Sequence, residues 1–191
     1  MNICVYGASS KTIDKNYIED GERLGREMGK RGHGLVFGGG TNGLMGAVAR
    51  GVYKEGGKII GVAPKFFNVD GILFENCDEL IRPDTMRERK QIMEDRADGF
   101  IITPGGIGTF EEFFEILTLK QLGRHNKPIA ILNTNGYYDK MAEFMENAIK
   151  GEFLNEKAKL LYEFVDTPKE ALDYIEGYDK EQIGITELKN I

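Results

Sequence analysis

The chain has 191 residues, of which 41% are hydrophobic and 29% charged, and its formal net charge is −6. This length and composition predict one globular domain, while the acidic balance argues against a general surface for nucleic acid or anionic membranes. No apolar run is long enough to span a bilayer and the first residues lack a signal-peptide pattern, so we expect a cytoplasmic protein.

Short apolar segments alternate with amphipathic segments along the whole chain. The apolar segments have the length and β-branched content of buried parallel strands, and they lie at 2–7, 34–40, 58–64, 99–106, 128–133 and 162–166. Segments with apolar residues at helical spacing follow at 14–32, 42–57, 84–98, 109–123, 136–152 and 167–177. This alternation predicts a single-domain α/β fold, a doubly wound parallel sheet with helices on both faces.

Two parts of the chain give a weaker pattern. We assign residues 1–177 to the domain and 178–191 to a C-terminal tail that has no readable pattern. The stretch 64–77 is irregular, and its adjacent Phe66 and Phe67 fit the core, a ligand site or a subunit contact equally well.

Histidines and cysteines give no sign of a metal site. His33 and His125 stand in glycine-rich or turn-rich contexts, and Cys4 and Cys77 form no close pair. We therefore expect loop or helix-end histidines, reduced thiols and no bound metal.

Three predicted strands end in glycine turns. These read "VYGASS" at 5–10, "VFGGGTNGLMG" at 36–46 and "ITPGGIGT" at 102–109. The carboxyl ends of parallel strands lie on one edge of a sheet, so the turns should converge on one crevice. None matches the dinucleotide fingerprint or the phosphate loop of NTPases. The first turn fits a tight connection or a ligand contact equally, whereas the glycine density of the other two favours phosphate or ribose.

The helix predicted over "DTMRERKQIM" carries two cations toward its buried side. Met86, Lys90 and Met93 share one face, and Arg89 lies at its border. Because an unpaired buried charge is costly, both cations should either extend to solvent or meet an anion.

The helix that follows "PGGIG" carries two adjacent acids. Its predicted core stripe consists of Phe110, Phe113, Phe114 and Leu117. Glu111 is best explained as an acid that complements the helix dipole, whereas Glu112 lies one turn from the anion-binding loop and is the better candidate for a reactive group.

"PGGIGTFEE" and "MRERK" together resemble the paired signatures PGGxGTxxE and MxxRK of the Lonely Guy family, cytokinin riboside 5′-monophosphate phosphoribohydrolases once labelled lysine decarboxylases. The similarity extends through "GGGTNGLMG" and "LKQLGRHNKPIAILNTNGYYD", over most of residues 1–165. It implies a Rossmann-like nucleotide-binding fold and a homodimer with sites near the interface. The implied reaction converts a cytokinin riboside 5′-monophosphate, or AMP, to free base and ribose 5-phosphate without a cofactor.

The resemblance also implies roles for individual residues. Arg89 and Glu112 match the catalytic pair. The implied substrate-binding residues are Lys90, Gly105, Gly106, Ile107, Gly108, Thr109 and Thr118, with Gly38, Gly39, Gly40, Gly43 and Met45 as a second part of the pocket. One position departs from the family: Phe66 stands where members often carry an acidic residue, and Asp70 or Glu75 are unaligned substitutes. The preferred base, plain adenine or a prenylated one, is therefore left open.

Cleavage of an N-glycosidic bond develops positive charge at C1′ and the ring oxygen. We expect Glu112 to stabilise that charge or to orient water, and Arg89 to bind phosphate or to assist departure of the base. A rival hypothesis is a non-catalytic carrier of nucleotide or molybdenum cofactor. Lysine decarboxylation is disfavoured because Lys120 and Lys127 have the pattern of helix-surface and helix-end residues, not of a Schiff-base lysine.

Overall fold

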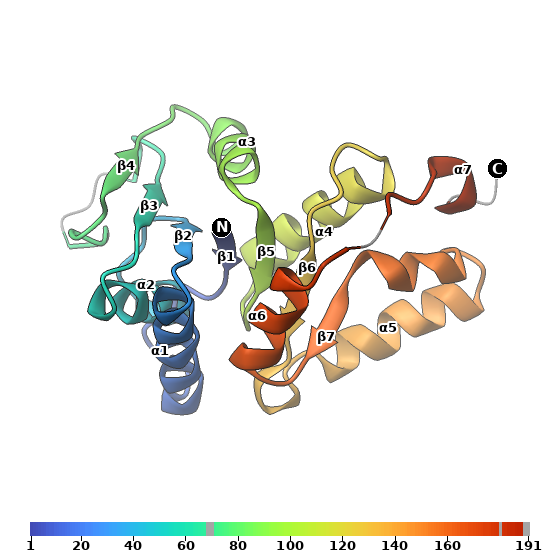
Figure 1. Ribbon diagram of the computed structural model, residues 1–191, viewed down its shortest axis with the longest axis horizontal. Coiled ribbons are helices and arrows are strands. Elements are labelled where there is room, and N and C mark those ends of the chain that lie inside the picture. Colours follow the sequence, from blue (N-terminus) through green and yellow to red (C-terminus); the bar gives the residue numbers. More distant parts are fainter. Residues whose placement is uncertain (68–70, 180, 189–191) are drawn as a thin grey trace.

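The computed structural model describes residues 1–67, 71–179 and 181–188. Within these ranges one parallel sheet has the strand order β4-β3-β2-β1-β5-β6-β7. The strands are β1 Asn2–Tyr6, β2 Gly34–Phe37, β3 Ile59–Val62, β4 Glu79–Ile81, β5 Gly99–Ile102, β6 Ile129–Leu132 and β7 Glu163–Val165. Figure 1 shows this sheet running from β4 to β7 across the molecule. The predicted α/β class with a doubly wound parallel sheet is confirmed.

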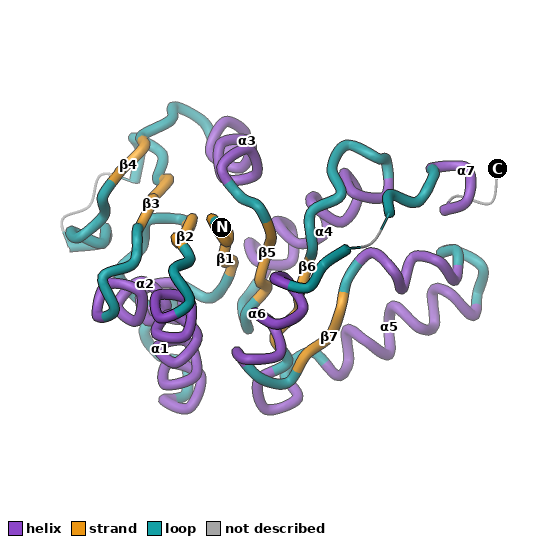
Figure 2. The backbone as a smooth tube through the Cα atoms, viewed as in Figure 1, coloured by secondary structure: helices purple, strands orange, loops and turns teal. Residues whose placement is uncertain are grey.

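Helices connect each pair of successive strands other than β3 and β4, as the tube view in Figure 2 shows. They are α1 Lys15–Lys30, α2 Gly43–Lys54, α3 Met86–Arg96, α4 Ile107–Gln121, α5 Asp139–Lys150, α6 Pro168–Glu176 and α7 Ile185–Leu188, with 3-10 turns η1 Thr134–Gly136 and η2 Glu156–Leu161. In the described part of the chain, no helix is both long enough and apolar enough to cross a bilayer.

Alternate residues of each strand enter cores on opposite faces of the sheet. On β1, Cys4 and Tyr6 pack in one core with α3 and α4, while Ile3 and Val5 pack in the other with α1, α2 and α6. This is the period-2 alternation of side chains along a strand. Because both faces are covered, the strands read as continuous apolar runs, which is why the sequence revealed them.

Three features differ from the sequence-based expectations. Strand β4 was missed, because its three residues form a partly exposed edge strand without an apolar run. Phe114 is 37% exposed and does not belong to the core stripe of α4. Lys120 is only 2% exposed, with its Nζ 4.5 Å from the centroid of the Tyr178 ring, so its assignment to the helix surface was wrong.

The C-terminal segment also contributes to packing. Leu188, in α7, is 1% exposed and joins the core that contains Cys4 and Tyr6. Tyr178, in the same segment, covers Lys120.

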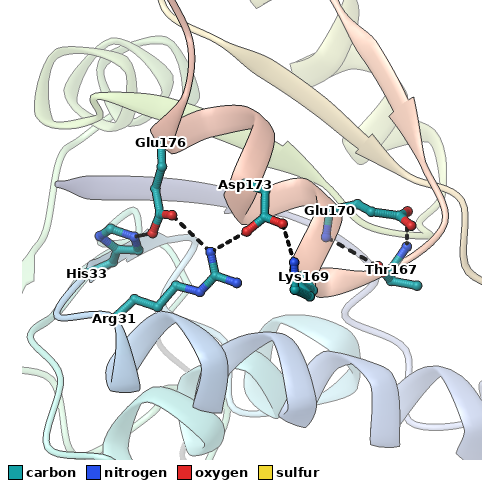
Figure 3. Close-up of polar contacts among 7 residues, drawn as sticks. All are labelled: Arg31, His33, Thr167, Lys169, Glu170, Asp173 and Glu176. Atoms are coloured by element: carbon teal, nitrogen blue, oxygen red, sulfur yellow. Dashed lines mark hydrogen bonds and ion pairs between the residues drawn. The ribbon is translucent and has the colours of Figure 1, made fainter.

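The edge of the sheet where the strands begin is tied by a polar network (Figure 3). Arg31, just after α1, donates to Asp173 at 2.8 Å and to Glu176 at 2.9 Å, both on α6. His33, just before β2, lies 2.6 Å from the same Glu176 carboxylate. The network therefore fastens α6 to α1 and β2 on the side opposite the carboxyl ends of the strands.

His125 makes the fold sensitive to acid. Its Nε2 donates to the Ile116 carbonyl at 2.9 Å and its Nδ1 accepts from the Lys127 N–H at 3.2 Å, so the neutral ring uses both nitrogens. Burial lowers the pKa of His125 from 6.5 to about 4. The unfolded chain therefore takes up this proton first as pH falls, and the stability contributed by neutral His125 is lost between about pH 6.5 and pH 4.

We expect the free energy of unfolding to fall by on the order of 2 kcal/mol from this residue between pH 7 and pH 4.5, after discounting for its partial exposure. Urea unfolding at both values, on wild type and His125→Asn, measures it. The variant should lose less stability on acidification than wild type, and equal losses would contradict the assignment.

Candidate active site at the carboxyl edge of the sheet

The candidate site lies where the strand order reverses. Strand β1 has β2 on one side and β5 on the other, and crevices at such switch points are where open α/β sheets bind ligands. A cavity of about 490 Å³ lies here. Its polar side is formed by Arg89, Glu112 and 106–109, and its apolar side by Met45, Phe67, Ile72, Leu73 and Met86.

A larger hollow of about 680 Å³ lies beside α1 and the loop after β6. Its most buried carboxylate, Asp20, already accepts from the Thr134 hydroxyl and from Arg23. That hollow contains none of the predicted site residues, whereas the smaller cavity collects most of them. We therefore place the site in the smaller one.

Arg89 and Glu112 are bound to each other inside this cavity. The Arg89 Nη1 donates to Glu112 Oε1 at 2.7 Å, and its Nε donates to the Val62 carbonyl at 3.1 Å. Both side chains are buried. Helix α3 begins with a Thr85–Glu88 capping box, which fixes the helix start one turn before Arg89. The pair thus joins α3 to α4, and Arg89 lies at the carboxyl ends of β2 and β3.

Burial sets the electrostatics of the pair. Removal from water raises the pKa of Glu112, and the neighbouring Arg89 guanidinium offsets this only in part. The negative charge of a buried carboxylate held by an arginine has little solvent to screen it. Glu112 is therefore suited to act on a positive charge brought close to it.

Gly38 makes room for Arg89. A Cβ at this position would stand 2.2 Å from Arg89 Nη2 and 3.2 Å from the Met45 sulfur. Only a residue without a side chain lets the guanidinium lie against the end of β2. Gly38, in the glycine turn "GGGTNG", thus leaves the space that the Arg89 guanidinium occupies, a role that the sequence did not reveal.

The other glycines of this turn divide into two kinds. Gly40 is of the first kind and lines the cavity, as does Met45 just after the turn. Gly39 and Gly43 do not, but they have φ angles of 75° and 62°, in the left-handed region that favours glycine. Their presence is explained by the backbone of the turn, and substrate contact by these two stays a prediction.

Helix α4 begins without a capping side chain. Its N-cap is Gly106, and within the described part of the chain neither Gly106 nor Gly108 has a heavy atom within 4 Å of where a Cβ would lie. The first N–H groups of a helix have no intrahelical acceptor, and together with the helix dipole they favour an anion. The open space at residues 106–108 therefore has the polarity that suits a phosphate-sized anion.

Several predicted binding residues do not line the cavity. Lys90 Nζ is paired with Glu111 and, at 2.9 Å, with Glu115. Thr118 is exposed on α4, and Gly105 packs against the Thr109 side chain. The anion that the sequence required for Lys90 is thus present within the protein, and ligand contacts by these residues stay predictions.

Of the residues in the apolar wall, only Met45 was predicted from the sequence as part of the pocket. Phe67 lines the cavity, whereas Phe66 is exposed outside it. Of the substitutes for an acidic residue, Asp70 lies outside the described residues and Glu75 is exposed away from the cavity. The double phenylalanine was the one available signal, and it did not distinguish a pocket from the core.

One parallel α/β sheet with an uncapped helix start and a buried Arg–Glu pair beside a cavity at the switch point defines a Rossmann-like protein. A family model described as "Possible lysine decarboxylase" matches residues 45–175. The chain belongs to this family, the Lonely Guy family of the resemblance noted above.

Two plant relatives match most of the chain. The rice protein named cytokinin riboside 5′-monophosphate phosphoribohydrolase LOG is 39% identical over 184 residues, which cover 96% of this chain and 76% of that protein. An Arabidopsis thaliana protein of the same name, LOG7, is 38% identical over 184 residues, which cover 96% of this chain and 85% of that protein.

Among solved structures, the molybdenum cofactor carrier protein of Chlamydomonas reinhardtii aligns with a TM-score of 0.69 at 21% identity, over 92% of this chain and 95% of that one. The molybdenum cofactor binding protein of Rippkaea orientalis aligns with a TM-score of 0.67 at 18% identity. That alignment covers 92% of this chain and 93% of the other protein. At this identity the likeness establishes a shared fold.

Proposed function

We propose that the protein hydrolyses the N-glycosidic bond of a cytokinin riboside 5′-monophosphate or of AMP, releasing the base and ribose 5-phosphate. The observation that carries the proposal is the buried Arg89–Glu112 pair, which shares one cavity with the open start of α4. The activity named for the plant relatives supports the same conclusion.

The cavity offers a place for each part of the substrate. The phosphate binds at the N–H groups of residues 106–109, where the helix dipole favours it. The base lies against the apolar wall that includes Met45 and Phe67. The ribose then lies between them, beside Glu112.

In this arrangement the C1′–N bond breaks with its electron pair passing to the base. Glu112 stabilises the oxocarbenium-like charge on the ribose and orients the water that attacks C1′. The water oxygen joins C1′ and the released proton neutralises the base. Arg89 holds Glu112 in place and contacts the phosphate or the departing base.

We also propose a homodimer with its sites near the interface. Ile107 is 86% exposed, and Met86 is 39% exposed, although both lie at the cavity. Phe114 extends the same exposed apolar surface along α4. A second copy would cover these side chains beside the mouth of the site.

The function is tested by incubating the purified protein with AMP and with isopentenyladenosine monophosphate. Ribose 5-phosphate and free base are expected from at least one of them, identified by mass spectrometry. The ratio of kcat/KM between the two defines the preferred base. Nucleotide binding without turnover of either would instead favour the carrier hypothesis.

A further inference from the structure

The turn before α4 is held by its carbonyl groups. The Pro104 carbonyl accepts from the Ala8 N–H at 3.0 Å, the Thr103 carbonyl from the Tyr138 hydroxyl at 2.8 Å, and the Gly105 carbonyl from the Tyr137 hydroxyl at 2.5 Å. Both tyrosines come from the loop after β6. The loop after β6, at the same edge of the sheet, therefore holds the turn before α4 through two hydrogen bonds.

The Tyr137 bond fixes the direction of an N–H group. The Gly105 carbonyl and the Gly106 N–H belong to one planar trans peptide unit and point in opposite directions. When Tyr137 holds the carbonyl on its side, the Gly106 N–H is turned away from Tyr137. Since Gly106 also lines the candidate active site, this orientation decides whether its N–H is available to an anion there.

Packing alone does not hold this peptide. Gly105 and Gly106 lack side chains and have the widest choice of backbone angles of any residue. A cavity of about 200 Å³ lies behind them, lined in part by Tyr17, Leu44 and Tyr137. The turn has space to move into this cavity, so the hydrogen bonds to its carbonyl groups keep it in place, and the Tyr137 hydroxyl is the one that holds the Gly105–Gly106 peptide itself.

We propose that Tyr137 is a positioning residue for the reaction, which orients the Gly105–Gly106 peptide so that the start of α4 is ready to bind the substrate phosphate. This inference rests on the proposed function for the identity of the anion. Tyr137 does not line the active-site cavity, and its effect passes through the turn. Its substitution should therefore weaken ground-state binding and leave the chemical step nearly unchanged.

The test is Tyr137→Phe, which removes one hydroxyl and keeps the ring. We expect KM for the nucleotide and Kd for ribose 5-phosphate, from calorimetry, to rise about fivefold to tenfold, as loss of one partly buried hydrogen bond implies. The value of kcat should stay within about twofold of wild type.

Tyr17→Phe is the matched control. The ring of Tyr17 packs edge-on against the ring of Tyr137, with 6.1 Å between the ring centroids. The Tyr17 hydroxyl has no hydrogen-bond partner among the described residues. This variant should keep wild-type KM and Kd, and both variants should keep the wild-type melting temperature within a few degrees.

Unchanged KM and Kd in Tyr137→Phe would overturn the inference, as would a fall in kcat at constant KM. So would failure of wild type to bind ribose 5-phosphate. If wild type binds ribose 5-phosphate, Tyr137→Phe weakens that binding and no nucleotide is cleaved, the inference stands and the proposed function fails.

Discussion

Replacing Glu112 by glutamine is expected to lower kcat for nucleotide cleavage by about three orders of magnitude while KM changes little. The amide keeps the size of the side chain and still accepts a hydrogen bond from Arg89, which now reaches Glu112 at 2.7 Å. What it lacks is the negative charge that we propose stabilises the ribose cation, and such transition-state groups contribute about 10²–10³ in rate or more. Steady-state kinetics with release of ribose 5-phosphate measures the loss.

The adjacent Glu111→Gln variant is the matched control, because Glu111 is exposed and paired with Lys90 outside the cavity. Its kcat should stay within about threefold of wild type. Similar losses at both positions would contradict the assignment to Glu112.

The pH profile provides a second readout of Glu112. Because burial raises its pKa, the carboxylate is protonated at a higher pH than an ordinary glutamate, and activity should fall at correspondingly higher pH on acidification. The Glu111→Gln variant should show the same loss of activity on acidification as wild type, including any contribution from protonation of the substrate phosphate. The Glu112→Gln variant should lack the contribution from protonation of Glu112.

Replacing Gly38 by alanine is expected to lower kcat/KM by about 10²-fold, although the change adds one methyl group. The new Cβ would stand 2.2 Å from Arg89 Nη2, so the guanidinium must move. That movement breaks its bonds to Glu112 and to the Val62 carbonyl, and a displacement of about 1 Å in a catalytic site can cost this factor. Circular dichroism and kinetics on the same sample separate misfolding from misplacement.

A double-mutant cycle shows whether Gly38 acts through Arg89. In an Arg89→Ala background the clash is absent, so Gly38→Ala should cost little further activity. Losses that multiply independently would mean that Gly38 contributes in some other way.

Local pattern was sufficient for most of the fold, whereas the family resemblance identified Arg89 and Glu112 as a pair, which the structure shows bonded to each other. Buried parallel strands reveal themselves as apolar runs, and the helical spacing around Arg89 and Glu112 placed both near a buried face. Strand β4 escaped because an exposed edge strand lacks that signal. The burial of Lys120 was not predicted, because Tyr178, whose ring packs over its Nζ, lies far along the chain.

The contacts that complete the site could not be predicted in the same way. The fit of Arg89 against Gly38 and the bond from Tyr137 to Gly105 depend on strand order and on which loops meet at the switch point. The positions of side chains around a single helix also do not show which acidic side chain of another helix a lysine or arginine will pair with. Lys90 and Arg89 are neighbours in sequence, yet one pairs with the surface acids of α4 and the other with Glu112.

The central position of β1 has a consequence for folding during synthesis. Its Ile3 pairs with Leu35 on one side and with Gly99 on the other, so one half of the sheet can assemble early while the other edge of β1 remains open. An open apolar strand edge invites pairing with other chains. The nascent chain is thus most exposed to aggregation before β5 emerges from the ribosome, and insertion of β5 both closes that edge and creates the crevice between Arg89 and the turn after β1.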